Sequence, residues 1–323
     1  MMRASVIIPT FGQRPEYLRD TVECVQKQKF PASSYEILVI DNSPDSSARA
    51  IVDKANRTGG HPVRYIREKS TGLHFARHAG ATAASGEVIV YVDDDVLMNE
   101  DWLGFIVEPF DDRQVGAVGG KIIVKFEGGN TPEWVSQFNL GLFAQLDYGD
   151  KKKDLKFPQD IYGSNMAVRK SVLLEVGGFN PDGIGDKKSI WFRGDGECGL
   201  NAKIYHSGNK IAYVPEGWIY HRISAQRLTP QSFYWKFFLN GVQDSFRRIR
   251  HLREQRLLIP SLLLYAFYCF GKSAYKYAES TVKNDRRHPL RARAWYWHGK
   301  GQHSLRVLFN NKLREHVLRN NYL

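Results

Sequence analysis

Cysteine is scarce in this sequence, and long apolar runs are missing from it. Its 323 residues include 3 cysteines, and none of them forms a CxxC pair. This pattern argues against a disulfide framework and a zinc site, and it is typical of a reducing compartment. No stretch reaches the roughly 18 consecutive apolar residues of a membrane-spanning helix, and the first residues hold too short an apolar run for a signal peptide. We therefore expect a cytoplasmic globular protein.

Two well-known phosphate-binding loops are also missing from the expected place. Neither GxGxxG nor GxxxxGK[ST] follows the first apolar run, Ser5 to Pro9. This argues against a dinucleotide-binding Rossmann site and against a P-loop. The lack of a Gly-rich, Lys/Arg-bearing loop after that run also argues against a nucleotidyltransferase, the third class of function that we considered.

Acidic residues are scarce in the last third of the chain. Residues 222–323 contain 20 Lys/Arg and 5 Asp/Glu, a net charge of +15, whereas residues 1–221 contain 26 and 29. The basic character of the protein therefore belongs to its C-terminal part, which should meet an anionic surface. No RNA- or DNA-binding motif accompanies the charge, so we expect no nucleic-acid partner.

The most informative stretch that is present runs from Gly86 to Val96, GEVIVYVDDDV. Its apolar run, Val88 to Val92, predicts a strand buried on both faces. Three adjacent carboxylates follow it, and because like charges repel one another, a cation should compensate them. A divalent ion with oxygen ligands, which also holds phosphate, meets that need. An acidic turn in solvent is the alternative, but it does not explain the buried strand.

Strand and helix patterns alternate along the first 100 residues. Apolar strands are expected at Ser5–Pro9, Tyr35–Ile40, Val63–Ile66 and Val88–Val92, with amphipathic helices between them. This order predicts a three-layer α/β structure with a parallel sheet. Ligands bind beyond the carboxyl ends of such strands. The residues at those ends are Pro9, Thr10, Asp41 and the three acids Asp93, Asp94 and Asp95.

Six segments in order carry a specific resemblance. VIIPTFG, EILVIDNSPD, GLHFARHAG and VIVYVDDDV are followed by YGSNMAVRKSVLLEVGGFNP and GDGECGLNAKIYHSG. Together they resemble family-2 glycosyltransferases of GT-A fold over about residues 3–221. The resemblance implies a Rossmann-like, mostly parallel sheet flanked by helices. It also implies inverting transfer of a sugar from a nucleotide-diphospho-sugar with Mn²⁺ or Mg²⁺.

The resemblance also implies roles for individual residues. It assigns nucleotide-sugar binding to Pro9, Thr10, Asp41, Arg77, Asp93, Asp94, Ser164 and Asn165. It assigns metal binding to Asp95, Asp93 and His221, with Asp95 as the leading ligand. Asp41 would accept a hydrogen bond from the base, and Arg77 would add positive charge near the diphosphate. The alternatives are a surface helix arginine for Arg77 and an ordinary, partly buried histidine for His221.

The general base is expected in Asp195-Gly196-Glu197, where the family usually has an adjacent Glu-Asp pair. Glu197 falls where the catalytic carboxylate lies, with Asp195 as the second candidate, and a base opposite the departing phosphate implies inversion. The alternative is that Glu197 only caps a helix. Trp134, Trp191, Phe192 and Trp218 lie in segments expected to line the acceptor side, where flat rings suit sugars, but the alternative that each belongs to the core is the more common one. The segment from Asn180 to Gly185 is expected to be a mobile loop.

The last part of the chain is expected to form a separate region. We predict a catalytic domain over residues 1–229 and a basic, aromatic-rich helical region over 230–323. Its apolar segment Leu257–Phe270 has only 14 residues, too few to span a bilayer comfortably. Basic residues mixed with aromatics suit peripheral contact with the inner face of a membrane. The alternative is a helical hairpin packed on the core.

Two hypotheses of function from different classes follow. The first is an inverting glycosyltransferase that acts on a glycan or lipid-linked acceptor in cell-surface or lipid-linked glycan assembly. The second is a protein that binds a nucleotide-sugar or serves as a membrane scaffold and has lost catalysis. The spacing of Asp195 and Glu197 motivates the second hypothesis.

Overall fold

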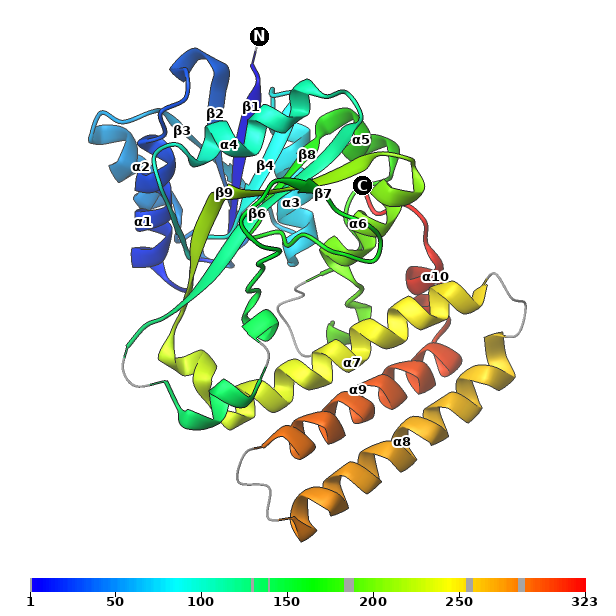
Figure 1. Cartoon of the computed structure of the whole chain (residues 1–323). Helices are drawn as coiled ribbons and strands as arrows, with labels where there is room; N and C mark the ends of the chain where they lie inside the picture. Colours follow the sequence, from blue (N-terminus) through cyan, green and yellow to red (C-terminus); the bar gives the residue numbers. More distant parts are fainter. Residues whose placement is uncertain (1, 129–130, 139, 183–188, 254–257, 284–287) are drawn as a thin grey trace.

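A curled sheet with flanking helices stands above a layer of long helices (Figure 1). The computed structural model describes residues 2–128, 131–138, 140–182, 189–253, 258–283 and 288–323. The apolar core lies between the sheet and its helices, and the strands of the sheet contribute most of its fully buried side chains. The helical layer begins with α7 at Pro230.

The first part of the sheet has the predicted parallel arrangement. Its strands lie in the order β3-β2-β1-β4, which are Val63–Arg67, Tyr35–Asp41, Ala4–Thr10 and Val88–Val92. The connecting helices are α1 (Pro15–Gln26), α2 (Arg49–Arg57) and α3 (Leu73–Ala83). All these strands are rich in β-branched residues, which pack well on a sheet covered on both faces. Their carboxyl ends point toward the helical layer (Figure 1).

The rest of the sheet is mixed, so the prediction of a parallel sheet holds only for the first four strands. Strand β8 (Asn165–Arg169) lies antiparallel between β4 and β6 (Val115–Phe126), and β6 is parallel to β9 (Lys210–Ile223). Three residues separate β4 from β5 (Val96–Met98). They are too few for a crossover to a parallel neighbour, so β5 pairs antiparallel with β9 instead.

Short elements complete this part of the molecule. They are β7 (Lys153–Asp154), α4 (Trp102–Val107), α5 (Lys170–Glu175) and α6 (Gly196–His206). The 3₁₀ turns are Ala32–Ser34, Glu108–Asp111, Glu133–Gln137, Leu140–Phe143, Ile190–Phe192 and Ala225–Leu228.

The helical layer contains α7 (Pro230–Arg253), α8 (Leu258–Val282) and α9 (Pro289–Phe309), followed by α10 (Asn311–Leu318). Helix α9 packs between α7 and α8, and α7 lies nearest the sheet (Figure 1). The apolar segment Leu257–Phe270, expected to be short, lies largely within α8, which has 25 residues. None of the helices in the described ranges is both long and apolar enough to cross a bilayer.

Two glycines allow α7 and α9 to approach closely. A Cβ atom on Gly241 would lie 2.0 Å from the carbonyl oxygen of Tyr296, and one on Gly299 would lie 2.2 Å from the carbonyl oxygen of Phe238. Both neighbours are backbone atoms, which cannot turn away as a flexible side chain can. The contact therefore requires that these positions carry no side chain.

Replacement of Gly241 by alanine should loosen the helical layer. We expect the free energy of unfolding to fall by about 2 kcal/mol, because overpacking costs more than the added helix propensity contributes. The matched control is Gly271→Ala in α8, where an added Cβ meets nothing within 4 Å. That variant should be more stable by up to about 1 kcal/mol. Urea unfolding followed by circular dichroism measures both, and equal stabilisation by the two changes would contradict the packing argument.

Candidate active site

A cleft opens where the parallel strands end, on the side that faces α7. Its volume is about 570 Å³, and polar and charged residues from both halves of the sheet line it. Pro9 and Thr10 from the end of β1 and Asn42 after β2 form one wall. Three acids after β4, together with Glu197 and His221, form the other side. Sequence positions that are nearly 200 residues apart thus meet in one place, as the strand-end argument predicts.

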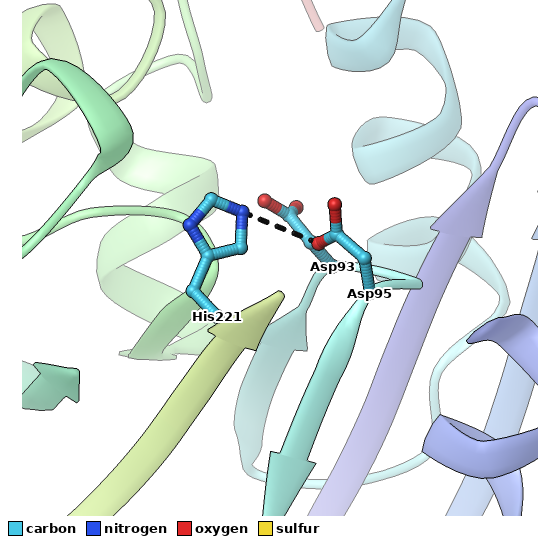
Figure 2. A group of neighbouring side chains, drawn as sticks. All are labelled: Asp93, Asp95 and His221. Carbon is cyan, nitrogen blue, oxygen red and sulfur yellow. Dashed lines mark ion pairs between the residues drawn. The ribbon is translucent and has the colours of Figure 1, made fainter. Parts of the chain in front are cut away.

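Asp93, Asp95 and His221 form a compact group in the cleft (Figure 2). One ligand atom from each lies within 4.8 Å of the others. The antiparallel pairing of β5 with β9 creates this proximity, because Val96 lies opposite His221 and the Arg222 N–H donates to the Asp95 carbonyl at 3.0 Å. The Nε2 atom of His221 lies 3.3 Å from Asp95 Oδ1.

The donor set fits a divalent cation. His221 Nδ1 lies 2.7 Å from the carbonyl oxygen of Phe143, which can only accept, so Nδ1 carries the proton and Nε2 is left as a possible ligand. Asp95 is 3% exposed, and its Oδ1 atom is buried without a hydrogen-bond donor. A buried carboxylate oxygen next to an imidazole nitrogen and a second carboxylate is an arrangement that Mn²⁺ or Mg²⁺ accepts.

Arginines compensate much of the negative charge at this site. Arg14 Nη2 lies 2.8 Å from Asp95 Oδ2, and Arg227 Nη1 lies 3.5 Å from the same atom. Burial alone would raise the pKa of Asp95, but His221 and these arginines outweigh it and lower that pKa. Thr10 Oγ1 donates to Asp94 Oδ2 at 2.5 Å. Burial and the neighbouring Asp95 raise the pKa of Asp94 to about 7.

Arg77 lies in the interior of the site, not on a helix surface. It is 2% exposed, and its Nη1 donates to Glu197 Oε2 at 3.1 Å. Its guanidinium is also 3.7 Å from carboxylate oxygens of Asp93 and Asp182. Burial lowers the pKa of Arg77, but the opposite effect of Glu197 and the two other acids is larger. The pKa is therefore raised overall, and the guanidinium remains charged. Arg77 therefore links Asp93, in the candidate metal site, to Glu197.

Glu197 faces the cleft from the first turn of α6. Burial and Asp182 raise the pKa of its carboxyl group to about 7, against the opposing effect of Arg77. Asp195 has a different environment, because it accepts a hydrogen bond from Asn180 at 2.7 Å and lies 3.6 Å from Arg247 of α7. It is not among the residues that line the cleft within the described part of the chain.

Three other predicted residues lie behind the cleft wall. Asp41 is fully buried and accepts hydrogen bonds at 2.6–3.2 Å from Ser43, Ala48 and Tyr65. Asn165 is fully buried as well: its amide donates to the Gly217 carbonyl at 2.8 Å, and its Oδ1 accepts from Trp102 Nε1 at 3.0 Å. The side chain of Ser164 is buried, and its hydroxyl has no hydrogen-bond partner.

The four aromatic residues expected on the acceptor side are placed elsewhere. Trp191 and Phe192 pack against the apolar cluster of α7–α10, and Trp134 packs against Phe233 of α7. Trp218 contacts Tyr220 on β9. None of them lines the cleft in the described ranges. In the loop expected from Asn180 to Gly185, residues 183–185 lie outside the described residues.

Several charged residues at the cleft were not predicted from the sequence. Arg14, Asp182, Arg193 and Arg227 line it, and Lys236 of α7 lies close enough for the charges of Arg193 and Arg227 to act on it. Arg14 directly precedes α1, close to the β1 end, and its position there was a usable signal. Arg227 and Lys236 follow His221 by only a few residues along the chain, but no pattern in the sequence indicates that this segment turns back to the cleft.

Comparisons with known proteins agree with this architecture. The family model described as Glycosyl transferase family 2 matches residues 5–177. A glucosyl-dolichyl phosphate glucuronosyltransferase of Haloferax volcanii is 25% identical over 262 residues, which cover 78% of this chain and 78% of that protein. A GalNAc(5)-diNAcBac-PP-undecaprenol β-1,3-glucosyltransferase of Campylobacter jejuni is 26% identical over 192 residues, 59% of each chain.

Solved structures show the same fold. A mannosyltransferase from Pyrobaculum calidifontis in complex with GDP-Man and Mn²⁺ aligns with a TM-score of 0.52 at 16% identity, over 96% of this chain and 88% of that chain. GalNAc-T7 with UDP, GalNAc and Mn²⁺ aligns with a TM-score of 0.54 at 18% identity, over 80% and 52%. At these identities the likeness shows the fold alone, which is GT-A, as predicted.

The proposed metal site can be tested without a turnover assay. Removal of a ligand, by Asp95→Asn or His221→Ala, should lower the affinity for Mn²⁺ at least tenfold, because even the groups that support metal ligands contribute 10–100-fold. The exposed Asp101→Asn serves as the matched control. Calorimetric titration with Mn²⁺, or its electron paramagnetic resonance signal, measures the change. Unchanged affinity in both site variants would show that the ion binds elsewhere.

Proposed function

Because this chain belongs to glycosyltransferase family 2, we propose that it transfers a sugar, with inversion, from a nucleotide-diphospho-sugar to an acceptor hydroxyl. The observation that carries this proposal is the shared cleft, which Asp95, His221 and Glu197 all line. Arg77 connects Glu197 with Asp93 through contacts of 3.1 and 3.7 Å. The two halves of the reaction, departure of the phosphate and activation of the hydroxyl, thus have separate groups at suitable places.

On the donor side, Asp95, His221 and Asp93 would hold Mn²⁺ or Mg²⁺. When bound, such an ion supplies Lewis-acid stabilisation to the leaving diphosphate. Pro9, Thr10 and Asn42 form the wall on which the nucleoside rests, and buried Asp41 fixes that wall through its hydrogen bonds to Ser43 and Tyr65. Asn165, which follows Ser164, stabilises the contact of β6, β8 and β9 beside the cleft, because its amide donates to the carbonyl oxygens of Lys121 and Gly217.

On the acceptor side, Glu197 is the base. It takes the proton from the acceptor hydroxyl, the hydroxyl oxygen forms the new bond at the anomeric carbon, and the phosphate leaves with the electron pair of the broken bond. Arg77 donates to the Glu197 carboxylate and so fixes its orientation. A pKa of about 7 suits a group that must accept a proton near neutral pH. We assign a structural role to Asp195, which connects the start of α6 to Asn180 and to Arg247 of α7.

The acceptor that we propose is a lipid-linked or growing surface glycan at the inner face of a membrane. Two of the relatives are named for dolichyl phosphate and undecaprenol-linked acceptors. Helix α8 provides the matching surface, because its outer side carries an apolar stripe, defined here as Leu264, Phe267, Gly271, Ala274 and Ala278. These residues recur at helical spacing, and Leu264 and Phe267 are 72% and 67% exposed.

Charge favours a lipid surface over a second copy of the chain. Residues 222–323 carry a net charge of +15, so two such regions would repel each other, whereas anionic headgroups attract them. Exposed Tyr268 and Tyr275 flank the stripe, and Lys272 lies beside it. Aromatic rings at headgroup depth and cations near anionic lipid are typical of interfacial helices. Contact with the membrane is then peripheral.

The test of the transferase proposal is a donor screen. The purified protein with Mn²⁺ should bind one of UDP-, GDP- or dTDP-sugars and release the nucleoside diphosphate, slowly without acceptor. Glu197→Gln should lower the transfer rate by about 10²–10⁴-fold, the usual contribution of a general base, without loss of donor binding. Binding without any turnover in the unaltered protein would instead favour the non-catalytic hypothesis, and absence of binding to every donor would refute both.

The pH dependence of the same reaction follows from the pKa of Glu197. The base is active when deprotonated, so kcat/KM should fall roughly tenfold per pH unit below its pKa of about 7. In Glu197→Gln the residual rate should lose this dependence. If kcat/KM of Glu197→Gln still falls below pH 7, the group that titrates is not Glu197.

Membrane contact can be tested with vesicles. The protein should sediment with vesicles that contain phosphatidylglycerol and not with phosphatidylcholine alone, and high salt should weaken the binding. Leu264→Asp with Phe267→Asp should abolish it, because both side chains lie in the α8 stripe. Leu174→Asp, at an exposed helical leucine of the sheet domain, is the matched control. Full binding by the double variant would refute the role of α8.

A further inference from the structure

Helix α7 brings a lysine close to the cleft, and among the described residues it has no carboxylate partner. Lys236 lies in the second turn of α7 and is half-buried. Its Nζ atom is 5.7 Å from the centre of the Phe143 ring. The backbone carbonyl of Phe143 accepts the hydrogen bond that orients His221, and the next residue, Ala144, lines the cleft. Lys236 therefore lies beside the cleft lining, next to the residue that orients His221.

The neighbours of Lys236 are mostly cationic. Burial and the positive charges of Arg227 and Arg193 lower the pKa of its ammonium group to about 7, and Glu197 opposes them. The arginines differ from Lys236 in having acidic partners: Arg227 lies 3.5 Å from Asp95, and Arg193 lies 3.3 Å from Asp182. Among the residues that the structure describes, no hydrogen bond or ion pair is formed by Lys236.

A half-buried cation beside two others is unfavourable unless an anion joins it. The proposed reaction brings in one anion, the nucleoside diphosphate, and Arg227 touches the residue that would hold its metal ion. The negative charge on the outer phosphate grows when the bond to the anomeric carbon breaks, because the electron pair stays on the phosphate oxygen. A cation placed there would bind the donor and stabilise its departure.

We propose that Lys236, with Arg193 and Arg227, forms a binding site for the sugar-bearing phosphate of the donor, supplied by the helical region. This inference rests on the proposed function. It gives α7 a part in the active site in addition to its part in the helical layer. It also makes the helical region necessary for the affinity of the catalytic domain for nucleoside diphosphates.

The first test is the binding of UDP, GDP and dTDP to the full-length protein saturated with Mn²⁺. For the diphosphate that binds best, Lys236→Met should lower the affinity by about 10–100-fold. Lys236→Arg, which keeps the positive charge, should bind that diphosphate nearly as tightly as the unaltered protein does. The control is Lys272→Met on the exposed side of α8, which should leave affinity unchanged. Equal affinity of Lys236→Met and the unaltered protein would overturn the inference. Failure of the unaltered protein to bind any diphosphate would instead count against the proposed function.

A second readout separates direct contact from a structural role. Free Lys236 is only partly protonated near pH 8, and a bound phosphate favours its charged form. Diphosphate binding at pH 8 should therefore take up protons, measured by calorimetry in buffers of different ionisation enthalpy. The uptake should persist in Glu197→Gln and disappear in Lys236→Arg, whose guanidinium is always charged. Undiminished uptake in Lys236→Arg would refute direct contact.

Discussion

The structure depends on the compensation of acids at the ends of strands. Asp93, Asp94 and Asp95 follow β4 directly, where the chain leaves a fully buried strand, and Asp95 is itself buried. Their charges are not met by one neighbour but by arginines from three separate segments: Arg14 before α1, Arg77 on α3 and Arg227 after β9. Since removal of one partner from a buried charge network is costly, these segments are held together as one unit. The same network leaves Asp95 Oδ1 free of donors, which is the opening that a cation can use.

Much of the fold could be predicted from the sequence, because its signals are local. Each of the first four strands is a short run rich in β-branched residues, and an amphipathic helix follows each of the first three, so the parallel half of the sheet and its strand-end site were both predictable. The reversed strand β8 was not, since no local pattern specifies the neighbour of a strand. Helix α8 also continues past the apolar run that ends at Phe270, as far as Val282.

The site divides in the same way. Asp95, His221 and Glu197 were expected in one cleft, and they lie there. Asp41 and Asn165, which were expected to bind the nucleotide-sugar, have protein hydrogen-bond partners behind the wall, and Trp191 packs on the helical region, as its core alternative has it. Whether a polar side chain faces a ligand or its own backbone depends on contacts between distant segments. The cations from Arg227 to Lys236 depend on such a contact, the return of α7 beneath the strand ends, so a linear pattern could not reveal them.

A membrane contact through α8 would determine how far the cleft lies from the lipid surface. Helix α9 lies between α7 and α8, and only α7 approaches the strand ends (Figure 1). Packed helix axes are about 8–10 Å apart, so the cleft above α7 would stand on the order of 20 Å or more from lipid beneath α8. A hydroxyl at the membrane surface would not reach Glu197 at that height. If α8 contacts the membrane, this distance favours an acceptor whose glycan already extends several sugars beyond its lipid. Such an acceptor belongs to an enzyme that elongates a lipid-linked chain, whereas an enzyme that adds the first sugar would need its active site at the lipid surface.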